Sequence, residues 1–192
     1  MGVTEYIVGD SMNIFYLNKE PRVCAKMHCD KHVVKMIVEY AQLLSTAHRV
    51  LDGEQYIDSS SGRRIKRWRL NDVDWENDLY KASFVNHPSA IWVRESRANY
   101  RYLSNLWYDL SLEYKYRYKK VHKTFKKLRY YLTLFPYNID WYAGLTEMPQ
   151  CMPDDVKADN AIDAYRNYYV QYKKSFAKWT DRPTPRFMEV AA

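Results

Sequence analysis

The sequence predicts a mainly α protein, a compact single-domain helical fold with a small β-hairpin or extended basic segment. Its 192 residues suit one domain with a sizeable core. It contains 47% hydrophobic residues and only 5 glycines, and long runs carry apolar residues at helical spacing. No internal repeat or low-complexity linker is visible. We therefore expect one domain over 1–192, with an N-terminal arm or short strands over 1–18 and a C-terminal tail over 181–192.

The first half of the chain predicts a helix followed by an extended segment. Residues 4–17 hold two short β-prone runs around Gly9, which favours a hairpin or an irregular arm. Pro21 suits the first turn of a helix, and 21–51 contains no further Gly or Pro before Asp52-Gly53 ends it. Residues 54–70 favour two strands or an extended loop that turns at 59–62.

The second half predicts three further helices and one ordered loop. A long helix of about thirty residues follows Asn86-His87-Pro88, and a shorter one covers about 124–135. The next segment, to about residue 155, has three prolines but also apolar and aromatic residues, so we expect an ordered loop. The last helix is predicted over 158–179.

The charge favours a polyanionic partner. Thirty Lys and Arg residues oppose 23 Asp and Glu, which gives a formal charge of +7, and this excess fits nucleic acid or an acidic membrane surface. No apolar run approaches the roughly 20 residues of a membrane span, and the N-terminus does not resemble a signal peptide. We expect a cytoplasmic protein that binds no membrane, in the host cell if the gene belongs to a phage.

The helix predicted over 21–51 carries a narrow polar row on one face. At spacings of three and four the row comprises His28, His32, Lys35, Glu39, Gln42, Thr46 and Arg49. The simplest interpretation is the solvent-facing edge of a core helix. The alternative is a site, because Glu39 is the only acid in the row. Such a carboxylate among cations suits the stabilisation of a cationic transition state beside a bound polyanion.

Two other kinds of site compete on this helix. Cys24, His28 and His32 have zinc-ligand chemistry, but three successive turns cannot converge on one tetrahedral ion. A cysteine nucleophile is less favoured, because Cys24 and Cys29 fit small core residues better. Three cysteines without a CxxC pair predict reduced thiols rather than disulfides. We predict no metal and no cofactor.

Two basic segments with interspersed aromatic residues favour DNA or RNA. The first contains Arg63, Arg64, Lys66, Arg67 and Trp68, with cations for phosphates and an indole that stacks on a base or wedges into a duplex. The second is KYRYKKVHKTFKKLRYY at 115–131. Each alone is compatible with a solvated surface, and in the first case with Trp68 in the core. Two in one small domain favour nucleic acid more strongly.

The start of the long helix is a further candidate for nucleic-acid binding. Asn86 is positioned to cap this helix, and His87 to act as a structural hydrogen-bonding residue. Alternatively, backbone N–H groups of the first turn, with Arg94 nearby, bind phosphate.

The ordered motifs resemble the phage pyrimidine-dimer DNA glycosylases of the endonuclease V type. Asp30 and His32, followed seven residues later by Glu39, resemble the active-site helix of that family. GRRIKRWRL at 62–70 resembles its basic segment, and His87 precedes a long helix in the same order. Arg182-Pro183-Thr184 follows the last helix, as in the family. The motifs spread over about 13–186, and each alone has little specificity.

The resemblance implies a mostly α fold that grips DNA, flips a nucleotide and cleaves a glycosidic bond. It assigns the family's glutamate to Glu39 and its helix histidine to His32. The family uses its N-terminal α-amine as nucleophile, whereas here the matching stretch begins near Asn13. Gly2, Lys31 or Lys35 is then the candidate amine. Two family arginines fall on Val38 and Gln42, so the lesion recognised is not transferable.

The predicted function is therefore a DNA glycosylase, with associated lyase activity if an imine forms, acting on double-stranded DNA. The predicted catalytic residues are Glu39, His32, Lys35, Asp30 and Lys31. The main alternative is a basic phage protein that binds nucleic acid without chemistry. A metal-dependent nuclease is disfavoured, because the sequence has no convincing carboxylate cluster.

Overall fold

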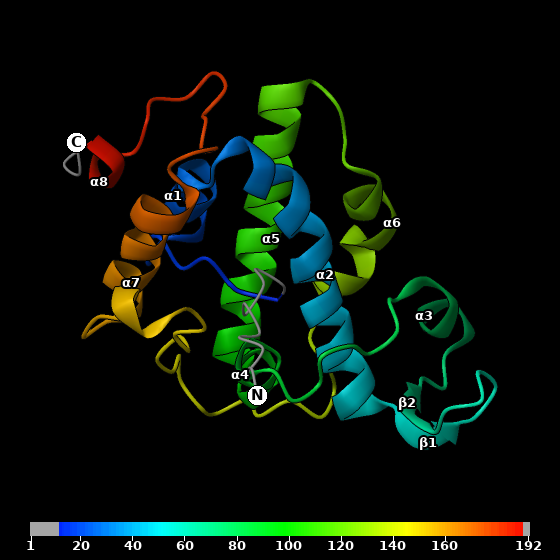
Figure 1. The fold of residues 1–192 in the computed structure, drawn as a ribbon. Helices are drawn as coiled ribbons and strands as arrows, with labels where there is room; N and C mark the ends of the chain where they lie inside the picture. Colours follow the sequence, from blue (N-terminus) through cyan, green and yellow to red (C-terminus); the bar gives the residue numbers. More distant parts are fainter. Residues whose placement is uncertain (1–11, 190–192) are drawn as a thin grey trace.

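The computed structural model describes residues 12–189, and this part of the chain is mainly α, as predicted. Figure 1 shows the helices gathered around α2 and α5, with a two-stranded sheet at one end of α2. The helices are α1 (Pro21–Met27), α2 (Asp30–Asp52), α3 (Val73–Asp78), α4 (Pro88–Glu95), α5 (Arg97–Tyr118), α6 (Lys123–Leu132), α7 (Ala161–Tyr168) and α8 (Arg186–Glu189). The remaining elements are β1 (Glu54–Asp58), β2 (Ile65–Arg69), the 3-10 turn η1 (Asp154–Val156) and the π-helical turn η2 (Tyr169–Lys173).

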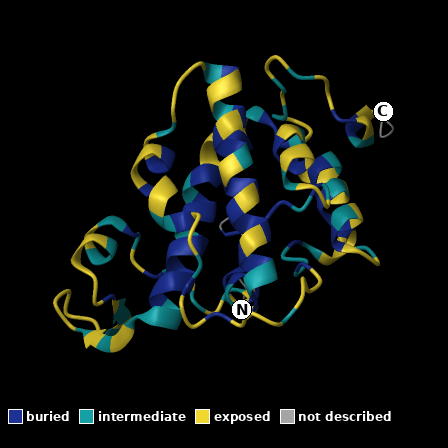
Figure 2. Ribbon diagram, turned by 180° about the vertical axis from the view of Figure 1, so that it is seen from behind, coloured by how far each residue is buried: buried dark blue, intermediate teal, exposed yellow. Residues whose placement is uncertain are grey.

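Helix α2 lies at the centre of the core and packs against α4, α5 and α6. Trp107 of α5 is completely buried, and its indole N–H donates to the Ile37 carbonyl of α2 at 2.9 Å. The buried hydrophobic side chains of these helices form one continuous cluster. In Figure 2 the faces turned toward this cluster are buried, and the outer face of α5 is exposed. Within residues 12–189 no helix is both long and apolar enough to cross a membrane.

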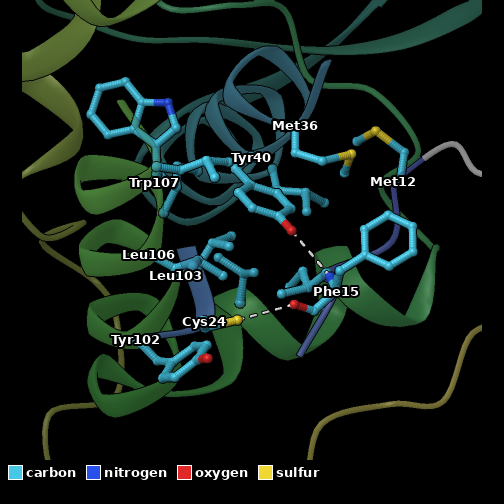
Figure 3. Close-up of a cluster of buried hydrophobic side chains, with 14 of the residues drawn as sticks. Met12, Phe15, Cys24, Met36, Tyr40, Tyr102, Leu103, Leu106 and Trp107 are labelled. Atoms are coloured by element: carbon cyan, nitrogen blue, oxygen red, sulfur yellow. Dashed lines mark hydrogen bonds between the residues drawn. The ribbon is translucent and has the colours of Figure 1, made fainter. Parts of the chain in front are cut away.

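Residues 13–18 form no strand but cross the core as an extended chain. Figure 3 shows how they are held: the Phe15 N–H donates to the Tyr40 hydroxyl at 3.1 Å, and the Cys24 thiol donates to the Phe15 carbonyl at 3.2 Å. These contacts lay the segment along α2. The remainder of the predicted N-terminal arm, residues 1–11, lies outside the described residues, as does the end of the predicted C-terminal tail, 190–192.

The continuous helix predicted over 21–51 is wrong, because the chain is extended at His28 and Cys29, between α1 and α2. His28 is buried there. Its Nδ1 bonds to the Cys24 carbonyl at 2.8 Å and its Nε2 to the Tyr40 hydroxyl at 2.9 Å. Both ring nitrogens are therefore satisfied in the core, which favours the break over one more helical turn.

The long helix predicted after Pro88 is likewise divided, into α4 and α5. Ser96 is extended at the junction, and its hydroxyl accepts the Asn99 N–H at 3.1 Å, so it caps α5. The same hydroxyl donates to the Gly144 carbonyl at 3.1 Å. A serine with helical neighbours therefore ends one helix and begins another.

The predicted extended segment is a β-hairpin. Strands β1 and β2 pair antiparallel with Glu54 opposite Arg69 and Asp58 opposite Ile65. Gly62 turns the connection with a φ of +76°, a conformation that favours glycine. Helix α3 was not predicted; it begins at Val73, and the carboxylate of the preceding Asp72 caps it by accepting two N–H groups of its first turn.

Two predictions for the last third are corrected in detail. The final helix is regular only over α7, and its expected continuation is the π-helical turn η2 followed by turns. The loop after α6 was expected to be ordered by its aromatic side chains. However, Tyr142 is 99% exposed and Trp141 49% exposed. Buried Ile139 and Met148 anchor this loop instead.

Candidate functional site

The polar row on α2 faces the protein interior, so its interpretation as a solvent-facing edge is wrong. His28, His32, Glu39, Thr46 and Arg49 are all buried, whereas the side chain of Lys35 is half-exposed. The extended residues 12–17 and the segment after α7 cover the row, as their contacts below show. A buried row of polar groups requires partners, and these partners distinguish structural members of the row from the candidate site.

Glu39 has partners on both carboxylate oxygens. Oε2 accepts the main-chain N–H of Met12 at 3.1 Å, and Oε1 forms an ion pair with Lys35 Nζ at 3.1 Å. The Glu39 side chain is 11% exposed and that of Lys35 49%. The carboxylate is therefore fixed by a buried N–H on one side and by an ammonium group that water reaches on the other.

Next to Met12, Asn13 contributes an unsatisfied polar atom. Asn13 is 1% exposed, and its Oδ1 has no hydrogen-bond partner among the described residues. A buried amide oxygen without a donor costs about 1–3 kcal/mol.

His32 is held by an aromatic residue on one side and a tyrosine hydroxyl on the other. Its ring stacks on Phe15 with centroids 4.2 Å apart, and Nδ1 shares a hydrogen bond of 2.5 Å with the Tyr169 hydroxyl. Burial raises the pKa of Tyr169 well above its usual range, so the hydroxyl keeps its proton at neutral pH. These contacts fix the orientation of the imidazole.

The segment from residue 168 onward supplies residues that sequence reasoning missed. Tyr169 opens the π-helical turn η2, a type of turn that is frequent at functional sites. Lys173, at the end of the same turn, is 5% exposed, and its Nζ lies 4.4 Å from the centroid of the Tyr168 ring. No sequence signal pointed to either residue, because Tyr169 is 137 positions from its partner His32.

Asp30 and Lys31, also predicted to be catalytic, have structural contacts. Asp30 accepts a hydrogen bond from Arg117 at 2.9 Å and three from Thr180. Burial would raise the pKa of Asp30, but these hydrogen bonds and the Arg117 charge hold it below its usual value. Lys31 Nζ lies 4.6 Å from the centroid of the Phe176 ring. Asp30 therefore ties the start of α2 to the end of the chain.

Arg117 was counted among the phosphate-binding cations but is buried. Its guanidinium also donates to Glu113 at 2.8 Å, and Glu113 accepts two hydrogen bonds from Arg182 at 2.8 and 2.9 Å. Arg182, in the motif that resembles the family's C-terminus, thus closes a chain of ion pairs. Its place in the structure is explained by this network.

The predicted DNA-binding hairpin lies at the far end of α2 from Asp30 (Figure 1). Arg63, Arg64 and Lys66 are exposed. Arg67 is partly buried, 3.9 Å from Asp58, and Trp68 is half-buried. The thirteen residues from Glu39 to the end of α2 place the hairpin about 20 Å from the carboxylate, so its cations do not belong to the same site.

At the start of α4 the cap is His87, not Asn86. His87 Nδ1 accepts the Ser89 N–H at 3.2 Å, and burial lowers its pKa, which favours the neutral ring that this role needs. Asn86 is exposed before the helix. Arg94 donates to the Val85 carbonyl at 2.7 Å and so holds the preceding loop. These contacts are structural, and the phosphate-binding role of this helix start remains a prediction.

The residues of the competing zinc interpretation are engaged elsewhere. The helix break removes the regular spacing of Cys24, His28 and His32, and both ring nitrogens of His28 already have partners. Burial raises the pKa of the Cys24 thiol to about 11. Within residues 12–189, no group of three His, Cys, Asp or Glu side chains is arranged to hold a metal ion.

The chain matches no family model, no curated protein and no solved structure. The functional inference therefore depends on the geometry around Glu39 and on the charge of the surface.

Proposed function

We propose that the protein is a DNA N-glycosylase, with Glu39 at its active site. The observation that carries the proposal is the position of the Glu39 carboxylate, which lies between the half-exposed Lys35 ammonium and the buried N–H of Met12. Asn13 Oδ1, buried and without a donor, lies on the adjacent residue. A charge that the fold holds in place is what a preorganised site needs.

In the proposed reaction the bond between the base and C1′ of the sugar breaks, and its electron pair leaves with the base. The sugar then carries oxocarbenium character, which the negative charge of Glu39 stabilises. Because Glu39 is held from two sides, it needs little reorganisation as the charge develops. His32, fixed by Phe15 and Tyr169, positions the substrate or moves a proton to the departing base.

Lys35 is the candidate nucleophile if an imine forms. The resemblance leads us to expect an amine beside the glutamate, and the nitrogen at the start of the matching stretch, that of Met12, does contact Glu39. That nitrogen is an amide and is not nucleophilic. Lys35 Nζ, 3.1 Å from Glu39, would add to C1′ as the free amine after its proton passes to water, which reaches the half-exposed side chain, so Glu39 keeps its negative charge.

The exposed cations of the hairpin would hold the phosphate backbone. Arg63, Arg64 and Lys66 are available for this role. At about 20 Å from Glu39 along α2, they would contact phosphates roughly six nucleotides from the attacked sugar, at about 3.4 Å per step. This distance requires the DNA to run along the length of α2.

The test is base release from duplexes that carry a panel of damaged and modified bases, with borohydride added in parallel. Borohydride reduces an imine to a stable protein–DNA adduct. We expect base release by the wild-type protein, and any adduct to map to Lys35. Lys35→Arg should abolish the adduct while keeping the ion pair with Glu39, and Lys31→Arg is the matched control.

Three other outcomes would change the assignment. Base release without an adduct would mean that water attacks the sugar. An adduct retained in Lys35→Arg would place the amine elsewhere. DNA binding without base release from any duplex would contradict the glycosylase and favour a binding protein without chemistry.

A further inference from the structure

A cavity of about 290 Å³ lies between the end of α2, the start of α3 and the loop after α6. Aromatic rings of Trp75, Phe135 and Tyr137 line it, and Asn71 and Asp72 lie in the same wall. A cavity of about 150 Å³ is enough for a benzene ring. This one has room for a single nucleobase, and its walls supply faces for stacking and polar groups for the edge of a base.

Beyond the cavity, the same loop exposes further aromatic rings. Tyr137 is 85% exposed, Tyr142 99% and Trp141 49%. We call Trp75 and the loop residues 135–142 the aromatic end. Large aromatic side chains in water are unfavourable unless a partner covers them. Here several lie together on one short loop, at the end of α2 that also carries the hairpin (Figure 1).

The loop is held in a fixed conformation. The Asp52 carboxylate accepts the N–H groups of Tyr137 and Asn138 at 2.8 and 2.9 Å. Asp140 accepts the N–H groups of Tyr142 and Ala143 at 2.8 and 3.1 Å. The exposed rings therefore project from an ordered backbone, which lowers the entropy cost of stacking a ligand on them.

Two arginines lie against the rings of the aromatic end, where the Asp52, Asp72 and Asp140 carboxylates also lie. The Arg97 guanidinium lies 4.6 Å from the centroid of Phe135 and 4.1 Å from that of Trp141, and Arg101 lies 5.3 Å from Phe135. Within the described part of the chain neither arginine has an ion pair, and Arg97 Nε is buried without an acceptor. A partner with flat rings complements the aromatic side chains, and the two guanidinium groups beside them suit phosphates.

We infer that the aromatic end binds unpaired bases of a nucleic-acid strand. One base enters the cavity between Trp75, Phe135 and Tyr137, its neighbours stack on Trp141 and Tyr142, and Arg97 and Arg101 face the phosphates. Stacking of bases on aromatic rings is sequence-tolerant, because every base has a π face. A paired base cannot enter the cavity, so the surface selects unpaired nucleotides.

The inference rests on the proposed function in taking the strand to be DNA. It adds that the DNA substrate carries unpaired bases near the attacked sugar. His48 and Asp52, both in the wall of the cavity, are nine and thirteen residues after Glu39, or about 14–20 Å along α2. At about 3.4 Å per nucleotide, unpaired bases would lie four to six positions from the attacked sugar.

The test compares binding of a fluorescein-labelled 20-nucleotide oligothymidylate and a 20-base-pair duplex by anisotropy at one salt concentration. Tyr137→Ala and Tyr142→Ala should each weaken single-strand binding about tenfold, the scale of one lost base stack, and leave duplex binding nearly unchanged. Tyr142→Phe, which keeps the ring, should bind normally. Tyr108→Ala is the matched control, because this tyrosine of α5 is 42% exposed and lies outside both the aromatic end and the basic segment 115–131.

Two results would overturn the inference: single-strand binding that both alanine variants retain, or an equal loss for single strand and duplex. Misfolding cannot mimic the expected result, since Tyr142 is almost fully exposed and circular dichroism would report any loss of helix. If the wild-type protein binds neither oligonucleotide, the proposed function fails as well. If the variants bind normally and wild-type base release persists, only the inference fails.

Discussion

Helix α2 buries two charged side chains ten residues apart, and the protein surrounds them differently. Arg49, completely buried, donates five hydrogen bonds, to Glu76 and to the main-chain carbonyls of Trp68, Glu76, Leu79 and Tyr80. Glu39 has one main-chain donor, the N–H of Met12, and one half-exposed lysine.

The difference separates structural polar groups from candidate chemical ones. Arg49 is saturated by groups of the fold, and it joins α2 to the hairpin and to α3, so no donor remains for a ligand. Glu39 is held by two contacts, so part of the capacity of its carboxylate to accept hydrogen bonds is unused. Incompletely satisfied polar groups in a folded protein are candidates for function, whereas complete networks stabilise.

Arg49→Met should have the largest effect on stability. It leaves the Glu76 carboxylate and several carbonyls without their donor, so we expect a loss of about 3–5 kcal/mol in the free energy of unfolding. Denaturant titration measures this. Arg63→Met, at an exposed position of the same hairpin region, is the control and should stay within about 0.5 kcal/mol. If Arg49→Met and Arg63→Met both changed the free energy of unfolding only slightly, Arg49 would not be a structural group. Its contrast with Glu39 would then fail.

Glu76→Gln should show the contribution of the Arg49 network through the pH dependence of the free energy of unfolding. Burial would raise the pKa of Glu76, but hydrogen bonds from Lys81, Leu70 and Arg49 hold it at about 2, below its usual value of 4.5. A carboxyl group whose pKa is lower in the folded than in the unfolded protein stabilises the folded state at pH values above the unfolded pKa. This stabilisation is lost as the pH falls toward the folded pKa. The stability difference from wild type, about 2 kcal/mol near neutral pH, should shrink between about pH 5 and pH 2. A constant difference would contradict this origin.

Asp30→Asn tests whether Asp30 is a structural residue, although it belongs to the motif with His32 and Glu39 that resembles the family's active-site helix. The change weakens its contacts with Arg117 and Thr180, so we expect a loss of about 1–2 kcal/mol in stability. Base release at 25 °C should stay within a few-fold of wild type. Loss of turnover in a folded Asp30→Asn protein would instead return Asp30 to the active site.

Alanine at Arg63, Arg64, Lys66 and Arg67 should alter DNA binding with little effect on stability. The log–log dependence of affinity on salt has a slope of about −0.9 per phosphate contact, and each lost contact should flatten it by about that amount. Anisotropy titrations between about 50 and 200 mM salt give the slope. An unchanged slope would remove the hairpin from the interface.

Sequence patterns predicted the helical class and most helices, because apolar spacing is a local signal. The helix breaks at His28 and Ser96 were missed, since they depend on hydrogen bonds to Tyr40 and Gly144, which are distant in sequence. The loop after α6 was predicted to be ordered because it carries apolar and aromatic residues, but its exposed rings do not order it; the side chains of Asp52 and Asp140 hold its backbone.

The candidate site was predictable only in part. Glu39, His32 and Lys35 share a helical face, so their spacing was enough to group them. The contributions of Met12, Asn13 and Tyr169 were not predictable, because they come from an extended segment and a π-helical turn that only the tertiary fold brings to α2. The burial of the polar row was likewise not predictable, because it depends on residues 12–17 and the segment after α7, which cover the row only in the tertiary fold.

The most direct test of Glu39 as a chemical rather than a structural group is Glu39→Gln. This variant keeps the shape of the side chain and an acceptor for the Met12 N–H, and it removes a half-exposed ion pair worth about 0.2–1 kcal/mol. We expect stability within about 1 kcal/mol of wild type and DNA binding that persists or tightens. Turnover should fall by about 100-fold or more, the scale of one preorganised electrostatic contact. Full activity, or loss of the fold, would contradict the assignment.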